Sequence, residues 1–206
     1  MARDDPGDRR LYLASTSPRR RDLLLLHGLV FDVVSPHVDE SAVDAGDPVR
    51  TAIELAARKA RSVALRVGRG FVVGADTVVW GDGFVFGKPA DRSDARRMLG
   101  VLSGRTHRVT TGFAVVNAAS DERRSGEATA RVTMRRIMAE EIDSFVGSGE
   151  ADDKAGAYGI QSAAMRFISQ VEGGRDTVIG LPVQEVLDAL AELGYRRPPP
   201  SEKGVP

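Results

Sequence analysis

The stretch STSPRRR, residues 15–21, places small hydroxylated residues directly before three consecutive arginines. Ser17 followed by Pro18 predicts a helix start, because a hydroxyl can cap exposed backbone N–H groups and proline fits the first helical turn. Cations there oppose the helix dipole, at a cost of about 0.3–1 kcal/mol per charge. A bound anion such as a phosphate chain would remove the conflict. The alternative is that the arginines point to solvent or pair with loop carboxylates.

Asp76 and Thr77, in the stretch GADTVV, interrupt an otherwise apolar run. A carboxylate in such surroundings costs free energy unless it is paired, bound to a metal or placed at a strand end that opens on a cleft. The functional interpretation is a carboxylate that binds a divalent cation or acts as a general base. The alternative is a turn aspartate between two short strands.

Four more charged residues could join such a site. Lys88 follows a predicted strand in FGKP, and Lys59 lies in ELAARKA, where a solvated helix face is the simpler interpretation. Asp39 and Glu40 belong to a loop rich in carboxylates and are either metal ligands or ordinary loop residues. Together with the arginines, these residues suit phosphates and a hard metal ion. His107 is placed at a strand edge and is assigned no role.

Helix and strand patterns alternate around these residues. Helices are predicted at residues 19–28, 49–67, 91–104, 138–149 and 182–194. Strands are predicted at residues 10–15, 30–36, 84–89, 106–119, 124–137, 165–174 and 176–182. Residues 70–83 are predicted to form a buried strand, a turn and a hairpin. Helices mixed with long neighbouring strands predict an α/β protein with a mixed sheet.

Composition excludes several classes of protein. The chain has 206 residues with 29 basic and 29 acidic side chains, so a stable partnership with nucleic acid or an anionic membrane is not favoured. The absence of cysteine excludes thiol catalysis and thiolate zinc sites. No apolar stretch reaches the length of a signal peptide or membrane span, which predicts a cytoplasmic protein. Residues 10–195 are predicted to form a single domain between disordered tails at 1–9 and 196–206.

A set of segments spread along the chain resembles the Maf-like nucleotide pyrophosphatase family. In chain order they are LASTSPRRRDLL, VDES, ELAARKA, GADTVV, GKP, LSGRTH, DKAGAYGIQ and VEG…VIGLPV. The resemblance implies hydrolysis of a nucleoside triphosphate between the α- and β-phosphates with a divalent cation, Mg²⁺ or Mn²⁺. It also implies a fold like that of inosine triphosphate pyrophosphatases: a bent mixed β-sheet flanked by helices, with two lobes and a central cleft. A homodimer is implied in the same way.

The resemblance also implies roles for residues that match the family's motifs. Asp76 corresponds to the proton acceptor, and Arg19 and Thr77 match positions tied to substrate choice. Glu40 matches an acid of the site and would hold the metal together with Asp76. Three basic residues match positions near the phosphates: Arg20, Lys59 and Lys88. Arg21 lies outside the motif and is predicted to be a solvated helix residue.

The segment AYGIQ resembles the dTTP/UTP branch of the family, in which the glutamine, here Gln161, belongs to the set that selects the base. After it, SAAMRF replaces a more usual glycine-containing stretch. Two alternatives stay open: a house-cleaning pyrophosphatase for modified nucleotides, and a nucleotide-binding regulator of septum formation. The presence of Asp76, Lys59 and Lys88 argues against a binding module without catalysis.

Overall fold

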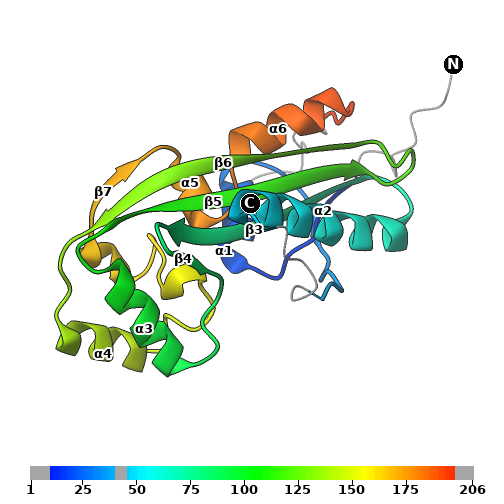
Figure 1. Cartoon of the computed structure of the whole chain (residues 1–206). Coiled ribbons are helices and arrows are strands. Elements are labelled where there is room, and N and C mark those ends of the chain that lie inside the picture. Colours follow the sequence, from blue (N-terminus) through cyan, green and yellow to red (C-terminus); the bar gives the residue numbers. More distant parts are fainter. Residues whose placement is uncertain (1–9, 40–45, 198–206) are drawn as a thin grey trace, which may run out of the picture.

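The computed structural model describes residues 10–39 and 46–197 and contains a seven-stranded mixed sheet (Figure 1). The strand order is β2-β1-β3-β5-β6-β7, and β4 also pairs with β3. The strands are β1 Leu11–Leu13, β2 Asp32–Val33, β3 Phe71–Gly81, β4 Phe84–Phe86, β5 Thr106–Asn117, β6 Arg123–Met134 and β7 Ile168–Glu172. The β1 pairs with β2 and β3 are parallel and all the other pairs are antiparallel. The α/β mixed-sheet prediction is confirmed.

Six α-helices and two short 3-10 helices surround the sheet in the described ranges. They are α1 Pro18–Leu26, α2 Pro48–Val67, α3 Arg92–Leu102, α4 Ala139–Gly147, η3 Ala155–Ala157, η4 Ala163–Phe167, α5 Arg175–Ile179 and α6 Val183–Glu192. The longest, α2, starts at Asp47, whose carboxylate accepts a hydrogen bond from the Arg50 N–H, and ends at Gly68 in the left-handed region. No helix in these parts of the chain combines the length and apolarity needed to cross a membrane.

Two glycines let α2 lie directly on one face of the sheet. A Cβ at Gly74 of β3 would stand 2.4 Å from the Ala56 carbonyl oxygen, and one at Gly112 of β5 would stand 2.4 Å from the Ala52 carbonyl carbon. Glycine in a strand interior marks this kind of close backbone approach. Gly112 is the β5 partner of Asp76. The approach therefore brings the buried face of the helix, which includes Lys59, close to Asp76.

The remaining core lies on the other face of the sheet and at its far end. Alternate residues of β1, β3 and β5 pack with α1 and α6 on the face opposite α2, as the period of two in a strand requires. A separate cluster joins α3, α4, β4 and the two 3-10 helices. Figure 1 shows α3 and α4 together at one end, away from α2 and α6. These clusters form the two parts of the fold between which a cleft lies.

The edge of β3 opposite β5 is only partly covered. Strand β1 pairs with β3 at residues 71–73, and β4 pairs with it at residues 79–81. Within the described chain, no strand pairs with residues 74–78 on that edge. Asp76 and Thr77 therefore lie at an opening in the sheet, and their side chains leave the strand on opposite faces.

One local prediction is wrong, and one alternative is excluded. The predicted hairpin is confirmed, since residues 71–81 pair with residues 84–86, but the strand runs through Asp76 along β5, which excludes the alternative of a turn there. Residues 175–179 form the helix α5 and not a strand; Thr177 and Val178 are buried there, and the Thr177 carbonyl accepts a hydrogen bond from the Thr111 hydroxyl. The other predicted helices and long strands are confirmed within a few residues. The predicted tail at residues 1–9 lies outside the described residues. The predicted tail at residues 196–206 lies outside them from residue 198 onward.

Candidate active site

A cleft of about 510 Å³ opens at the uncovered edge of β3. Its lining comes from the start of α1, from α2, from the middle of β3, from the segment after β4 and from the segment around Gln161. The predicted site residues that line it are Arg19, Arg20, Lys59, Asp76, Thr77, Lys88 and Gln161. Glu40 lies outside the described residues. Asp39 is exposed and is absent from the lining as far as the chain is described.

Lys59 of α2 and Asp76 of β3 form an ion pair at the base of the cleft. The Lys59 Nζ lies 2.6 Å from Asp76 Oδ1, and the two side chains are 8% and 16% exposed. Water screens the attraction little at such a site. The interpretation of Lys59 as a solvated helix residue is therefore wrong. A charged carboxylate that faces the cleft from a rigid strand can accept a proton from a water molecule.

Arg20 and Thr77 belong to a second hydrogen-bond network. The Arg20 guanidinium donates to the Gly180 carbonyl at 2.7 Å and to the Thr77 hydroxyl at 3.1 Å. The Thr77 and Thr111 hydroxyl oxygens are 2.9 Å apart. Because Thr111 gives its only proton to a carbonyl of α5, Thr77 must donate to Thr111 and accept from Arg20. We call Arg20, Lys59, Asp76 and Thr77 the cleft floor.

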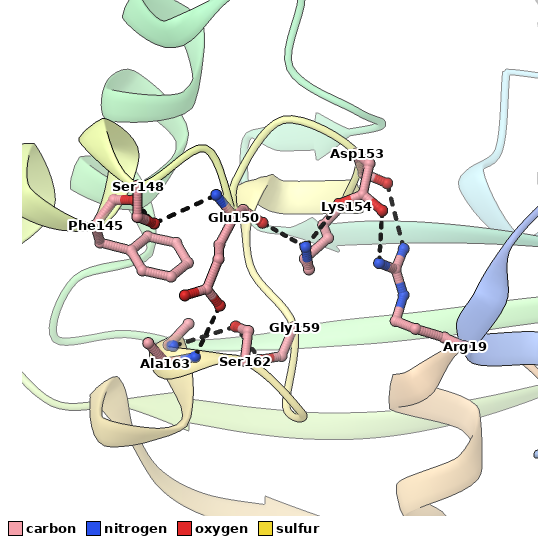
Figure 2. Close-up of polar contacts among 10 residues, drawn as sticks. Arg19, Phe145, Ser148, Glu150, Asp153, Lys154, Gly159, Ser162 and Ala163 are labelled. Carbon is pink, nitrogen blue, oxygen red and sulfur yellow. Dashed lines mark hydrogen bonds and ion pairs between the residues drawn. The ribbon is translucent and has the colours of Figure 1, made fainter. Parts of the chain in front are cut away.

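Arg19 faces a different partner from that of Arg20. Its guanidinium lies 2.8 Å from Asp153 Oδ2, in the segment before Gln161 (Figure 2). Arg21 instead pairs with its neighbour Asp22 at the surface, where both side chains are more than half exposed. This confirms the prediction that Arg21 is a solvated helix residue. The two arginines inside the motif line the cleft and the one outside it does not.

Residues 150–163, which we call the loop wall, form one side of the cleft. Gln161 lines the cleft from this segment, and Lys88 lines it from beyond β4; both side chains are exposed. The Gly156 N–H donates to the Gly87 carbonyl at 2.9 Å, which ties the loop wall to the segment that carries Lys88. The loop wall thus carries Gln161 and is bonded to the segment that carries Lys88.

Positive charge is in excess in the cleft. In its lining, five cationic side chains accompany the carboxylates of Asp76 and Asp153 within the described residues. An elongated polyanion such as a triphosphate suits this distribution. No group of three or more His, Asp or Glu side chains that could hold a metal by itself occurs in residues 10–39 and 46–197.

Several residues that shape the site are not among those predicted from the sequence. Asp153 and Lys154 line the cleft, although their sequence indicates only a polar loop. His107, predicted at a strand edge with no role, is only 1% exposed, and its Nε2 lies 2.6 Å from the Tyr158 hydroxyl in the loop wall. Burial lowers the pKa of His107 to about 4. Its direct neighbours, Thr106 and Arg108, are polar, so the local sequence does not signal the burial of His107.

Comparisons with known proteins match almost the whole chain. A family model described as Maf-like protein matches residues 10–193. A dTTP/UTP pyrophosphatase of Symbiobacterium thermophilum is 46% identical over 185 residues, which cover 90% of this chain and 94% of that protein. The dTTP/UTP pyrophosphatase of Thermococcus gammatolerans is also 46% identical over 185 residues, with 90% and 97% covered. The dTTP/UTP pyrophosphatase of Geotalea uraniireducens is 42% identical over 184 residues, with 89% and 95% covered.

Proposed function

This chain belongs to the Maf-like protein family, and on that premise we propose that it hydrolyses dTTP and UTP to the monophosphate and pyrophosphate. The observation that carries the proposal is a carboxylate, Asp76, in a cleft whose charged lining residues are mostly cations. The names of the relatives, dTTP/UTP pyrophosphatases at 42–46% identity, support the choice of substrates.

The cations of the cleft would bind the triphosphate and offset the charge that develops on the leaving pyrophosphate. Arg20 is fixed by hydrogen bonds to the Ser15 and Thr77 hydroxyls and to the Gly180 carbonyl. Such a preorganised cation stabilises a transition state without the cost of reorienting during the reaction. Arg19 and Lys88, which also line the cleft, would complete the phosphate contacts.

Asp76 would act as the general base. It accepts a proton from the water that attacks the α-phosphorus, and the bond from that phosphorus to the bridging oxygen breaks as pyrophosphate leaves. Lys59, 2.6 Å from Asp76 Oδ1, holds the carboxylate in place. The strand position of Asp76 fixes its distance from the cations of the cleft floor.

A divalent cation fits this set of residues when substrate is present. Magnesium is commonly held by one or two protein carboxylates together with substrate phosphates, and Asp76 supplies one such carboxylate. Glu40, the other proposed ligand, lies outside the described residues. The cation, Mg²⁺ or Mn²⁺, would neutralise phosphate charge in the transition state.

Gln161 would select the base. A side-chain amide carries one acceptor and two donors, which matches the N–H and carbonyl pair on the edge of uracil or thymine. The Thr77 hydroxyl and Arg19 would contribute to substrate choice from the cleft floor and from the α1 N-terminus. The proposal also includes a cytoplasmic location and a single domain over residues 10–195. It includes a homodimer as well, and sedimentation of the full chain can test that oligomeric state.

A panel of ordinary and modified nucleoside triphosphates tests the function. Pyrophosphate release is measured for each, with and without Mg²⁺ or Mn²⁺. We expect the highest kcat/KM for dTTP and UTP, and only with the metal present. A higher kcat/KM for a modified nucleotide would favour the house-cleaning alternative. No pyrophosphate from any nucleotide with either metal would contradict the proposal and favour a nucleotide-binding regulator.

A further inference from the structure

The loop wall is closed on itself by two charged residues (Figure 2). The Lys154 Nζ donates to the Glu150 carbonyl oxygen, and the Glu150 carboxylate accepts a hydrogen bond from the Ala163 N–H at 3.1 Å. Ala163 lies two residues after Gln161. Across Gln161, the Ser162 hydroxyl donates to the Gly159 carbonyl at 2.7 Å. The backbone that carries Gln161 is therefore held from both ends.

Asp153 connects this closed loop to Arg19. One oxygen, Oδ1, lies 2.6 Å from the Lys154 Nζ, and the other, Oδ2, lies 2.8 Å from Arg19 Nη1. Arg19 Nη2 also donates to the Asp153 carbonyl oxygen at 3.3 Å. Although partial burial alone would raise the pKa of Asp153, the hydrogen bonds from Lys154 and Arg19 lower it. The carboxylate stays charged, and two contacts to one residue fix the plane of the Arg19 guanidinium.

We propose that Asp153 is a positioning residue that determines specificity: it holds Arg19 against the loop wall and so sets the separation between Arg19 and Gln161. This inference rests on the proposed function, in which both of those residues contact the nucleotide. A purine nucleoside needs more room than a pyrimidine nucleoside. A fixed separation between the two sides therefore favours dTTP and UTP over GTP and dGTP.

Because the contacts of Asp153 are exposed, its effect on specificity can be measured separately from any effect on folding stability. The Asp153 side chain is 56% exposed and that of Arg19 is 23% exposed. Exposed ion pairs contribute little to folding stability because water and salt screen them. Removal of the carboxylate should release Arg19 from the loop wall and leave the fold intact.

Asp153→Asn tests the role, with Asp152→Asn as the matched control. Asp152 is the neighbouring acid, is exposed and does not line the cleft as far as the structure describes it. We expect the ratio of kcat/KM for UTP to that for GTP to fall about tenfold in Asp153→Asn and to stay unchanged in Asp152→Asn. The urea unfolding midpoint should be the same for both variants and the unmodified chain.

A wild-type selectivity ratio in Asp153→Asn would overturn the inference. If every nucleotide then gained affinity equally, Asp153 would merely compete with phosphate for Arg19. Titration with α,β-methylene-UTP and α,β-methylene-GTP measures the same ratio by binding. This binding experiment tests the role of Asp153 even if no nucleotide is hydrolysed. Failure of the proposed function can therefore be distinguished from failure of this inference.

Discussion

The cleft floor and the loop wall hold their charged groups in different ways. In the floor, Lys59 and Asp76 are nearly buried and come from a long helix and a central strand. In the wall, Asp153 is more than half exposed and meets Arg19 and Lys154 at the surface. Loss of one member of a buried pair leaves an uncompensated charge, whereas an exposed pair is worth about 0–1 kcal/mol. The floor is thus coupled to folding, and the wall can change while the fold persists.

Asp76→Asn should have the largest effect of any change in the cleft floor. The amide keeps the shape but accepts no proton at neutral pH, so we expect kcat to fall by about 10²–10⁴-fold. Pyrophosphate release from dTTP with Mg²⁺ measures it. Asp82→Asn, in the exposed β3–β4 turn, is the control and should keep the unmodified rate. Full turnover by a well-folded Asp76→Asn protein would show that Asp76 is not the base.

Gly112→Ala should damage the same floor through the backbone. Its Cβ would stand 2.4–2.5 Å from three backbone atoms of Ala52 and Ile53, so α2 must move off the sheet and take Lys59 away from Asp76. We expect a loss of about 3 kcal/mol in the free energy of unfolding, measured with urea.

Gly100→Ala in α3 is the matched control for this change. A Cβ added at Gly100 would have no atom within 4 Å, and alanine in a helix is worth about 0.5–1 kcal/mol more than glycine. A gain in the free energy of unfolding at Gly100, together with a loss at Gly112, would confirm that the close approach of α2 to the sheet causes the loss, and not the replacement of glycine as such. Equal losses at the two positions would contradict it.

The cleft floor is largely predictable from sequence, but its geometry is not. The apolar neighbours of Asp76 and the helix start at Ser17-Pro18 mark both places as unusual. The pattern does not show that β3 runs straight through Asp76, because that depends on pairing with β5 over ten residue pairs, far away in the sequence. The sequence predicts a solvated Lys59 for a similar reason. The exposure of Lys59 depends on the close approach of α2 to Gly74 and Gly112, which local sequence does not show.

The loop wall is much less predictable. Its sequence, rich in charged and small residues, is typical of a solvated loop. Arg19 and Asp153 are separated by 134 positions, and no local pattern links them. Residues 175–179 resemble a strand because Thr, Val and Ile favour strands, whereas the short helix buries Thr177 and Val178 against the sheet. Local propensity gives way to tertiary packing in each case.

His107 anchors the loop wall to the core and should make stability depend on pH. Its pKa is about 4 when folded, against an ordinary value of 6.5, because burial disfavours the charged ring. Between these values the unfolded chain binds more protons, so stability is lost as pH falls. From pH 7 to pH 5 the loss from this residue should be about 2 kcal/mol.

His107→Gln should remove that part of the pH dependence. Urea unfolding at a series of pH values from 7 to 5 measures it, and the difference in slope between variant and unmodified chain isolates the single residue. His27→Gln is the control, since the His27 side chain is 37% exposed beside Asp176. An unchanged slope in His107→Gln would mean that His107 does not stay neutral when buried.

Thr77→Val should have the smallest effect and most sharply tests how the cleft floor is held. Valine keeps the shape of threonine but can neither accept from Arg20 nor donate to Thr111, so we expect a loss of about 1 kcal/mol in stability. Thr106→Val is the matched control for Thr77→Val, because it breaks a Thr–Thr hydrogen bond of 2.8 Å with Thr133 at an exposed site. Its effect on stability should be within about 0.5 kcal/mol. If the two variants lose the same stability and Thr77→Val keeps its kcat/KM for UTP, the floor network does not orient Arg20, and the contrast between floor and wall fails there.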